Sequence, residues 1–209
     1  MSQHVDVTGT GRATGTPDVV LLEVRVQCDG PDVARALQDA SRRMTALQDV
    51  AGTRGIQPAD LQTTGSGVQQ RWANDGSGVV GYTAWQSLRV RVRETGDAGE
   101  LVTAFAKAAG DALAVDGITL GISDAAPLAR EARELAFSDA RDKAEQYAAL
   151  AGRSLGAVRS VSDLPSGGGY PAPVARMKVM AADSAGSMPV QAGEQSVEAS
   201  VAVRWSWSD

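Results

Sequence analysis

The chain has one cysteine and one histidine among its 209 residues. Cys28 has no partner for a disulfide within the chain, so we expect a buried, reduced thiol. His4 lies near the start of the sequence, and no motif marks a nucleophile for it. A zinc site needs about four ligands, and the scattered carboxylates form no cluster in the sequence. The sequence therefore predicts no cofactor, no metal site and no enzyme; a hydrolase or transferase without histidine is the catalytic alternative.

Long apolar runs are also missing. No run approaches the length of about 20 residues that a membrane-spanning helix requires, so we expect no transmembrane segment. The first residues, 1–5, lack the charged and apolar regions of a signal peptide. As written, the sequence predicts a cytoplasmic protein. The alternative is a periplasmic or secreted protein whose leader has been removed, because Val5 already belongs to a strand pattern.

The chain has no excess of positive charge. Its 20 lysines and arginines stand against 25 aspartates and glutamates, which gives a net charge of -5 and a pI near 5.0. Such a balance provides no field that attracts a phosphate backbone, so nucleic acid is disfavoured as a partner. The hydrophobic fraction of 43% is sufficient for a substantial core.

Between residues 19 and 123 the hydrophobic patterns follow the order strand, helix, strand, strand, helix, strand. Strict alternation over residues 20–27 predicts a strand with one buried face. A stripe at helical spacing predicts the first helix, and it comprises Val33, Leu37, Ala40, Met44, Leu47 and Ala51. Residues 61–72 and 79–94 predict a hairpin, which is followed by a helix from Asp97 and a strand over residues 117–123. This is the order of a ferredoxin-like plait.

The remaining segments predict a second α+β layer. Residues 5–15 are rich in glycine and threonine, residues 127–151 have the stripe of a long helix, and residues 155–161 and 197–207 have strand patterns. We therefore predict an α+β fold in which a ferredoxin-like plait, residues 19–123, is inserted into a discontinuous domain of residues 1–18 and 124–209. Residues 164–195 form a loop rich in Pro, Gly and Met within that domain.

Two local patterns have simple interpretations. Gly9 and Gly11 resemble part of a dinucleotide-binding motif, but a strand follows them where that motif needs a helix, so we predict a glycine-bent edge strand. Asp139 and Lys143 stand four residues apart on the long helix, and we expect this pair on its outer side, where it stabilises the helix.

Arginines alternate along the second strand of the hairpin. Arg89, Arg91 and Arg93 have the parity opposite to the apolar residues, and Trp85 shares it. We expect them on the side of the sheet away from the helices, together with Arg25 of the strand before. Three interpretations stay open: cross-strand pairing with carboxylates, a subunit interface, and a surface that binds a ligand or nucleic acid.

Several short motifs, taken in order, resemble the SIMPL domain family. They are Val7-Thr-Gly-Thr-Gly11 with Pro17-Asp18, Gly55-Ile56 before Asp60-Leu-Gln-Thr63, Gly81-Tyr-Thr-Ala84, Gly117-Ile118, Lys143-Ala-Glu145, and Met188-Pro-Val-Gln-Ala-Gly-Glu194. The resemblance covers nearly the whole chain. It implies a plait inserted in a second α+β domain, homo-oligomeric assembly and an association with stress tolerance. Members commonly carry an export signal, and the family has no agreed catalytic residues to transfer.

The leading hypothesis is thus a non-enzymatic protein that acts through homo-oligomeric assembly and binding of a protein partner. The candidate interaction surface comprises Arg25, Arg89, Arg91, Arg93 and Trp85. The candidate oligomer-contact loop comprises Tyr170, Met177, Met180 and Met188. The alternative is a ligand- or nucleic-acid-binding plait that uses the arginines.

Overall fold

The computed structural model describes residues 4–165, 172–173 and 193–208. The chain divides into two compact units, and each is described by itself. The plait unit comprises residues 18–121, and the terminal unit comprises the described residues of 4–17, 122–165, 172–173 and 193–208. The sequence-based prediction of an inserted domain stays a prediction, because compactness does not show that either unit folds alone.

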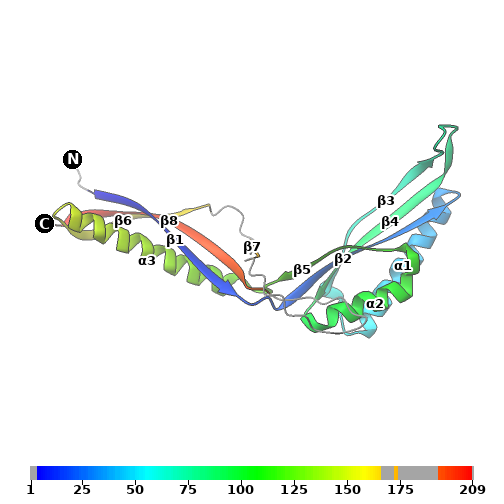
Figure 1. Cartoon of the computed structure of the whole chain (residues 1–209), viewed down its shortest axis with the longest axis horizontal. Helices are drawn as coiled ribbons and strands as arrows, with labels where there is room; N and C mark the ends of the chain where they lie inside the picture. The colour runs from blue at the N-terminus through cyan, green and yellow to red at the C-terminus, as the bar shows by residue number, and fades with distance from the viewer. Residues whose placement is uncertain (1–3, 166–171, 174–192, 209) are drawn as a thin grey trace. The chain divides into compact units, whose positions relative to one another are not determined.

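The strands and helices of the plait unit follow one another along the chain in the predicted order. Strand β2 (Val19–Gly30) leads to helix α1 (Val33–Thr53), strands β3 (Leu61–Trp72) and β4 (Val79–Val92), helix α2 (Ala98–Ala109) and strand β5 (Leu113–Gly121). The antiparallel sheet has the order β3-β4-β2-β5, and both helices lie on one face of it (Figure 1). This is the ferredoxin-like arrangement, and it confirms the predicted α+β fold class.

Alternation and helical spacing explain the plait core. Val20, Leu22, Val24 and Val26 of β2 are at most 1% exposed and face the helices. The Asp32 side chain accepts a hydrogen bond from the Arg35 amide at 2.8 Å and thereby caps α1. The buried stripe of α1 comprises Ala36, Ala40, Met44, Leu47 and Ala51.

The sequence analysis was wrong about the start of this stripe. Val33 and Leu37 are 37% and 43% exposed, so the buried positions of α1 begin at Ala36. Ala36 is fully buried one position before the exposed Leu37, so the buried stripe is rotated about the helix axis from the predicted one at this end of α1.

Strand β5 begins four residues before the predicted start and ends two residues before the predicted end. Its pairing with β2 shifts at one place: Glu23 lies opposite Gly117, and Val24 lies opposite Val115. Asp116 is therefore an extra residue in a β-bulge, and the alternation of side chains changes phase there. A period-2 pattern cannot be followed through such an insertion.

The terminal unit is a sheet covered by one long helix. Strand β1 (His4–Gly15) pairs with β8 (Gln195–Ser208), which pairs with β6 (Ser154–Leu164), and the short β7 (Ala172–Pro173) also pairs with β8. Helix α3 (Ala126–Leu150) lies along this sheet (Figure 1). The two ends of the chain thus meet in one β ladder, with Val7 opposite Val203.

Glycines and alanines allow α3 to approach β1 very closely. A Cβ atom on Gly9 would lie 2.5 Å from the Ala140 nitrogen, and one on Gly11 would overlap the backbone of Ala132 and Ala136. Ala132, Ala136, Ala140 and Ala144 are fully buried. These glycines lie in an edge strand, as predicted, and β1 pairs with β8 without a register shift. Their role is to leave room for the backbone of the helix.

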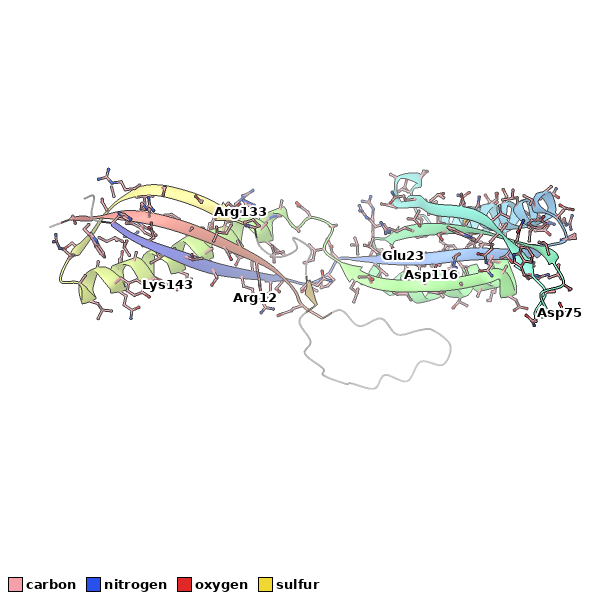
Figure 2. All side chains as sticks on the ribbon, turned by 90° about the horizontal axis from the view of Figure 1, so that it is seen from above. Arg12, Glu23, Asp75, Asp116, Arg133 and Lys143 are labelled. Carbon is pink, nitrogen blue, oxygen red and sulfur yellow. The ribbon has the colours of Figure 1, made fainter. Side chains whose placement is uncertain are left out.

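Two side chains of α3 bond to the backbone of β1. The Thr10 amide donates to Asp139 Oδ2 at 2.8 Å, and Lys143 Nζ donates to the Thr8 carbonyl at 3.1 Å. Lys143 Nζ also lies 2.7 Å from Asp139 Oδ2. Figure 2 shows Lys143 on the part of α3 next to β1. The predicted ion pair of the helix is therefore present, and it has a second role that the spacing did not indicate, because it covers polar groups along the edge of the sheet.

Gly11→Ala is expected to destabilise the terminal unit by about 1–3 kcal/mol or more, because a methyl group there overlaps backbone that cannot rotate away. Urea unfolding monitored by circular dichroism measures this. Gly117→Ala is the matched strand control, since no heavy atom lies within 4 Å of its added Cβ. Equal unfolding midpoints for the two variants would contradict the close-approach account.

Asp139→Asn is expected to lower the free energy of unfolding by about 0.2–1 kcal/mol at pH 7, because its carboxylate is only partly shielded from water. The hydrogen bond from Lys143, followed by that from the Thr10 amide, lowers the pKa of Asp139 below its ordinary value of 3.8. The stabilisation is thus complete above about pH 4 and is lost as the pH falls through the lowered pKa. Unfolding curves at pH 7 and pH 3 should show a smaller difference between the variant and the wild type at pH 3 than at pH 7.

Candidate functional site

The predicted arginines and Trp85 lie on the face of the plait sheet opposite the helices. Arg89 and Arg91 alternate with the buried Leu88, Val90 and Val92, and the register places Leu21, Glu23, Arg25 and Gln27 of β2 opposite residues 91, 89, 87 and 85 of β4. Arg93 follows the last residue of β4. We call this set, Arg25, Trp85, Arg89, Arg91 and Arg93, the arginine face.

Carboxylates neutralise two arginines in the middle of this face. Arg89 donates from Nε and Nη2 to Glu23 Oε1 at 3.0 and 2.7 Å, directly across the β2–β4 ladder. Arg25 Nη2 lies 3.1 Å from Oδ1 of Asp116, the residue inserted at the bulge of β5. Figure 2 shows Glu23 on β2 and Asp116 on β5. Exposed pairs of this kind stabilise a sheet by about 0.2–1 kcal/mol each.

Arg93 makes a two-pronged pair with Asp60. Its Nε lies 2.9 Å from Oδ2 and its Nη2 3.1 Å from Oδ1. The Asp60 side chain is only 3% exposed, whereas that of Arg93 is 65% exposed. The hydrogen bonds from Arg93 lower the pKa of the Asp60 carboxyl. The sequence offered Asp60 only as the start of a family motif and not as a site residue, because it ends a short 3-10 turn (Pro58–Asp60) and no periodic pattern indicates its burial.

Arg91 is the arginine of this face without an ion pair in the part of the chain that the structure describes. It lines a cavity of about 270 Å³ at the end of β4. The wall holds three arginines and four acidic residues: Arg54, Arg91, Arg93, Asp60, Glu94, Asp97 and Glu100. Arg54 pairs with Glu100 at 3.2 Å. This wall has no excess of positive charge, so its composition does not favour a multiply charged anion.

Trp85 is partly covered by its own sheet. Cβ atoms built on Gly65 and Gly67 of β3 would lie 2.9–3.3 Å from the indole ring. The ring therefore lies over the backbone of β3, where two residues without side chains make room for it. This contact occupies one side of the indole, which a base of a bound nucleic acid would need for stacking.

The other candidate groups are the metal-ligating side chains and Cys28. Among residues 4–165, 172–173 and 193–208, no three His, Cys, Asp or Glu side chains are placed to hold a metal ion. Cys28 is buried, and this burial raises the pKa of its thiol.

In the described residues, no helix has the length and apolarity that spanning a membrane requires. The predicted contact loop, Tyr170, Met177, Met180 and Met188, lies outside the described residues.

Comparison with known proteins identifies relatives along almost the entire chain. Residues 5–205 match the family described as "SIMPL: Protein of unknown function (DUF541)". The 26 kDa periplasmic immunogenic protein of Brucella melitensis is 32% identical over 96% of this chain and 83% of its own length, and the protein of the same name from Brucella abortus matches equally. The uncharacterized protein YggE of Escherichia coli K12 is 26% identical over 95% of this chain and 78% of its own length. The predicted cytoplasmic location receives no support from these names.

Arg93→Met is expected to lower the unfolding midpoint of the plait unit, because it leaves the Asp60 carboxylate buried without its cation. Since Arg93 lowers the pKa of Asp60 below 3.8, the difference from the wild type should be complete above about pH 4 and should shrink as the pH falls. Arg91→Met, two positions earlier, is the matched control and should lower the midpoint by less, because Arg91 acts on Asp60 only through a weaker Coulombic attraction without a hydrogen bond. Thermal unfolding of both variants at pH 7 and pH 3 tests this. An equal decrease of the unfolding midpoint in the two variants at pH 7 would refute the role of the Arg93–Asp60 pair.

Proposed function

The chain belongs to the SIMPL family, and we propose that it acts without catalysis, through self-association and the binding of a protein partner. The supporting observation is a group of exposed apolar side chains at one end of the plait unit. Six large apolar residues that are at least 37% exposed lie at the start of α1 and on the β3–β4 hairpin. We call them the hairpin surface: Val33, Leu37, Val68, Trp72, Val79 and Val80.

The topology brings these residues to one region of the plait unit. Gly30, the last residue of β2, lies opposite Tyr82 of β4, and α1 begins three residues after Gly30. The start of α1 is therefore next to the hairpin end of the sheet, as Figure 1 also shows. Trp72 is 60% exposed and Val80 53% exposed. Val79 and Val80 are neighbours in one strand and project to opposite faces of the sheet, so these side chains surround the hairpin end and do not share one face. Exposed apolar side chains near one another are typical of a surface that contacts another protein.

The competing function, binding of nucleic acid or another anion to the arginine face, has weaker support. Arg25, Arg89 and Arg93 are each paired with a carboxylate, which leaves Arg91 as the one unpaired guanidinium of that face among the described residues. The chain also has a net charge of -5. Binding of a polyanion needs several cations that can release counterions, and this face offers one.

We place this activity in the periplasm. The two Brucella relatives, which align with 96% of the chain, are named as periplasmic proteins. A link to stress tolerance, which the family resemblance implied, stays a prediction of this proposal.

Size-exclusion chromatography with light scattering tests the proposal over a range of concentrations. The wild type is expected to have a mass of at least two chains of 21.6 kDa each. The double variant Trp72→Ser, Val80→Ser should have a lower mass, because it removes apolar contact area. Leu150→Ser, in the terminal unit, is the control, since Leu150 is 78% exposed and lies outside the hairpin surface. A wild type that is monomeric at every concentration would refute self-association.

A further inference from the structure

In the part of the chain that the structure describes, the two sheets have four long edge strands, β1 and β6 in the terminal unit and β3 and β5 in the plait unit, and the two-residue β7 pairs with β8 alone. An edge strand has a row of backbone amides and carbonyls that no neighbouring strand satisfies. Such a row can pair with another strand, so folded proteins commonly protect it with charged side chains, bulges or covering groups. The four edges of this chain differ in that protection.

Three of the edges have protection of this kind. Asp139 and Lys143 bond to the outward amide of Thr10 and carbonyl of Thr8 on β1. Strand β5 has the bulge at Asp116, and a charged residue stands at its centre. Strand β6 departs from regular pairing with β8 at two places, between residues 155 and 158 and between 158 and 160, and it contains Arg159 and Asp163.

Strand β3 lacks these features over most of its length. Residues 61–70 include no charged residue and no proline. Between two irregularities, one near Thr63 and one between Arg71 and Trp72, residues 65–71 pair regularly with residues 81–87 of β4. No side chain among the described residues donates to or accepts from the β3 backbone. The outward groups of this seven-residue stretch are therefore open to a further strand.

Apolar exposure accompanies this open edge. Val68, in the middle of the regular stretch, is 42% exposed, and Trp72 at the end of the strand is 60% exposed. Both belong to the hairpin surface, so a strand added to β3 would cover apolar side chains as well as backbone groups. Main-chain hydrogen bonds with neighbouring apolar contacts are the usual elements of strand addition.

We propose that the edge of β3 pairs antiparallel with β3 of a second copy of this chain, which joins two plait sheets into one. This inference rests on the proposed self-association and names its contact surface. Because antiparallel pairing of identical strands has twofold symmetry, one surface serves both copies.

The charge distribution favours a second copy as the occupant. When the pairing centres on Val68, each Val68 lies opposite the other, and Arg71 lies opposite Gly65 of the partner copy. Arg71 is the one charged residue of β3, and it is already paired with Asp29, which also accepts a hydrogen bond from Thr83 Oγ1 at 2.6 Å. No like charges therefore meet across the symmetric contact, whereas like charges opposite one another would oppose pairing.

Val68→Lys tests this contact, because it would place two lysines opposite each other at the centre of the pairing. We expect the dissociation constant of the assembly to rise about tenfold or more, measured by sedimentation equilibrium. Val115→Lys is the matched control: Val115 is 39% exposed and lies on β5, the other edge of the same sheet. It should leave the dissociation constant unchanged.

Amide hydrogen exchange of the wild type provides a second measurement that needs no variant. Pairing predicts that alternate amides within residues 65–71 become protected as the protein concentration rises, and this result would support the inference even if Val68→Lys failed to fold. Protection that does not depend on concentration would assign the edge to another occupant and would overturn the inference.

The possible failures are distinguishable. A wild type that is monomeric at all concentrations refutes both the proposed self-association and the β3 contact. A wild type that assembles while residues 65–71 exchange freely refutes the β3 contact alone, and so does equal assembly of the two lysine variants. In these last two cases the proposed self-association stands.

Discussion

The close approach of α3 to β1 is the contact on which the terminal unit depends. Gly9 and Gly11 bring the strand backbone against the backbone of the helix, where buried alanines replace larger side chains. β1 and β8 come from opposite ends of the chain and pair over twelve positions, from His4 opposite Ser206 to Gly15 opposite Gln195. Because the helix packs against both strands, its small residues hold together segments from the two ends of the sequence in one close-packed core.

This close packing has a second consequence, because it places polar side chains of α3 at the edge of β1. Asp139 and Lys143 reach the Thr10 amide and the Thr8 carbonyl only because the helix lies so near the strand. An ion pair with the spacing of a helix surface pair thus becomes a cover for a sheet edge. β3 has no helix side chain in such a position among the described residues, and that contrast makes its edge the one suited to a further strand.

The arginine face shows how pairing changes the meaning of a charged surface. A row of arginines on one side of a sheet resembles an anion-binding surface in sequence. In the fold, Glu23, Asp116 and Asp60 come from three different elements and neutralise three of these arginines. The apolar side chains of the hairpin surface, unlike these arginines, stay exposed. This exposure is the physical reason for preferring protein contacts to polyanion binding as the function of the plait unit.

Local sequence patterns were enough to predict the elements with regular periodicity and, through their order, the α+β plait. The alternation in β2, the helix of 25 residues at α3 and the opposite parities of Leu88 and Arg89 all follow from such patterns. The partner of each arginine, the burial of Asp60, the bulge at Asp116, and the exposure of Val33 and Leu37 emerged only from the folded chain. These features depend on which segments become neighbours, and a periodic pattern specifies the side of an element that a residue occupies but not the atoms that it meets there.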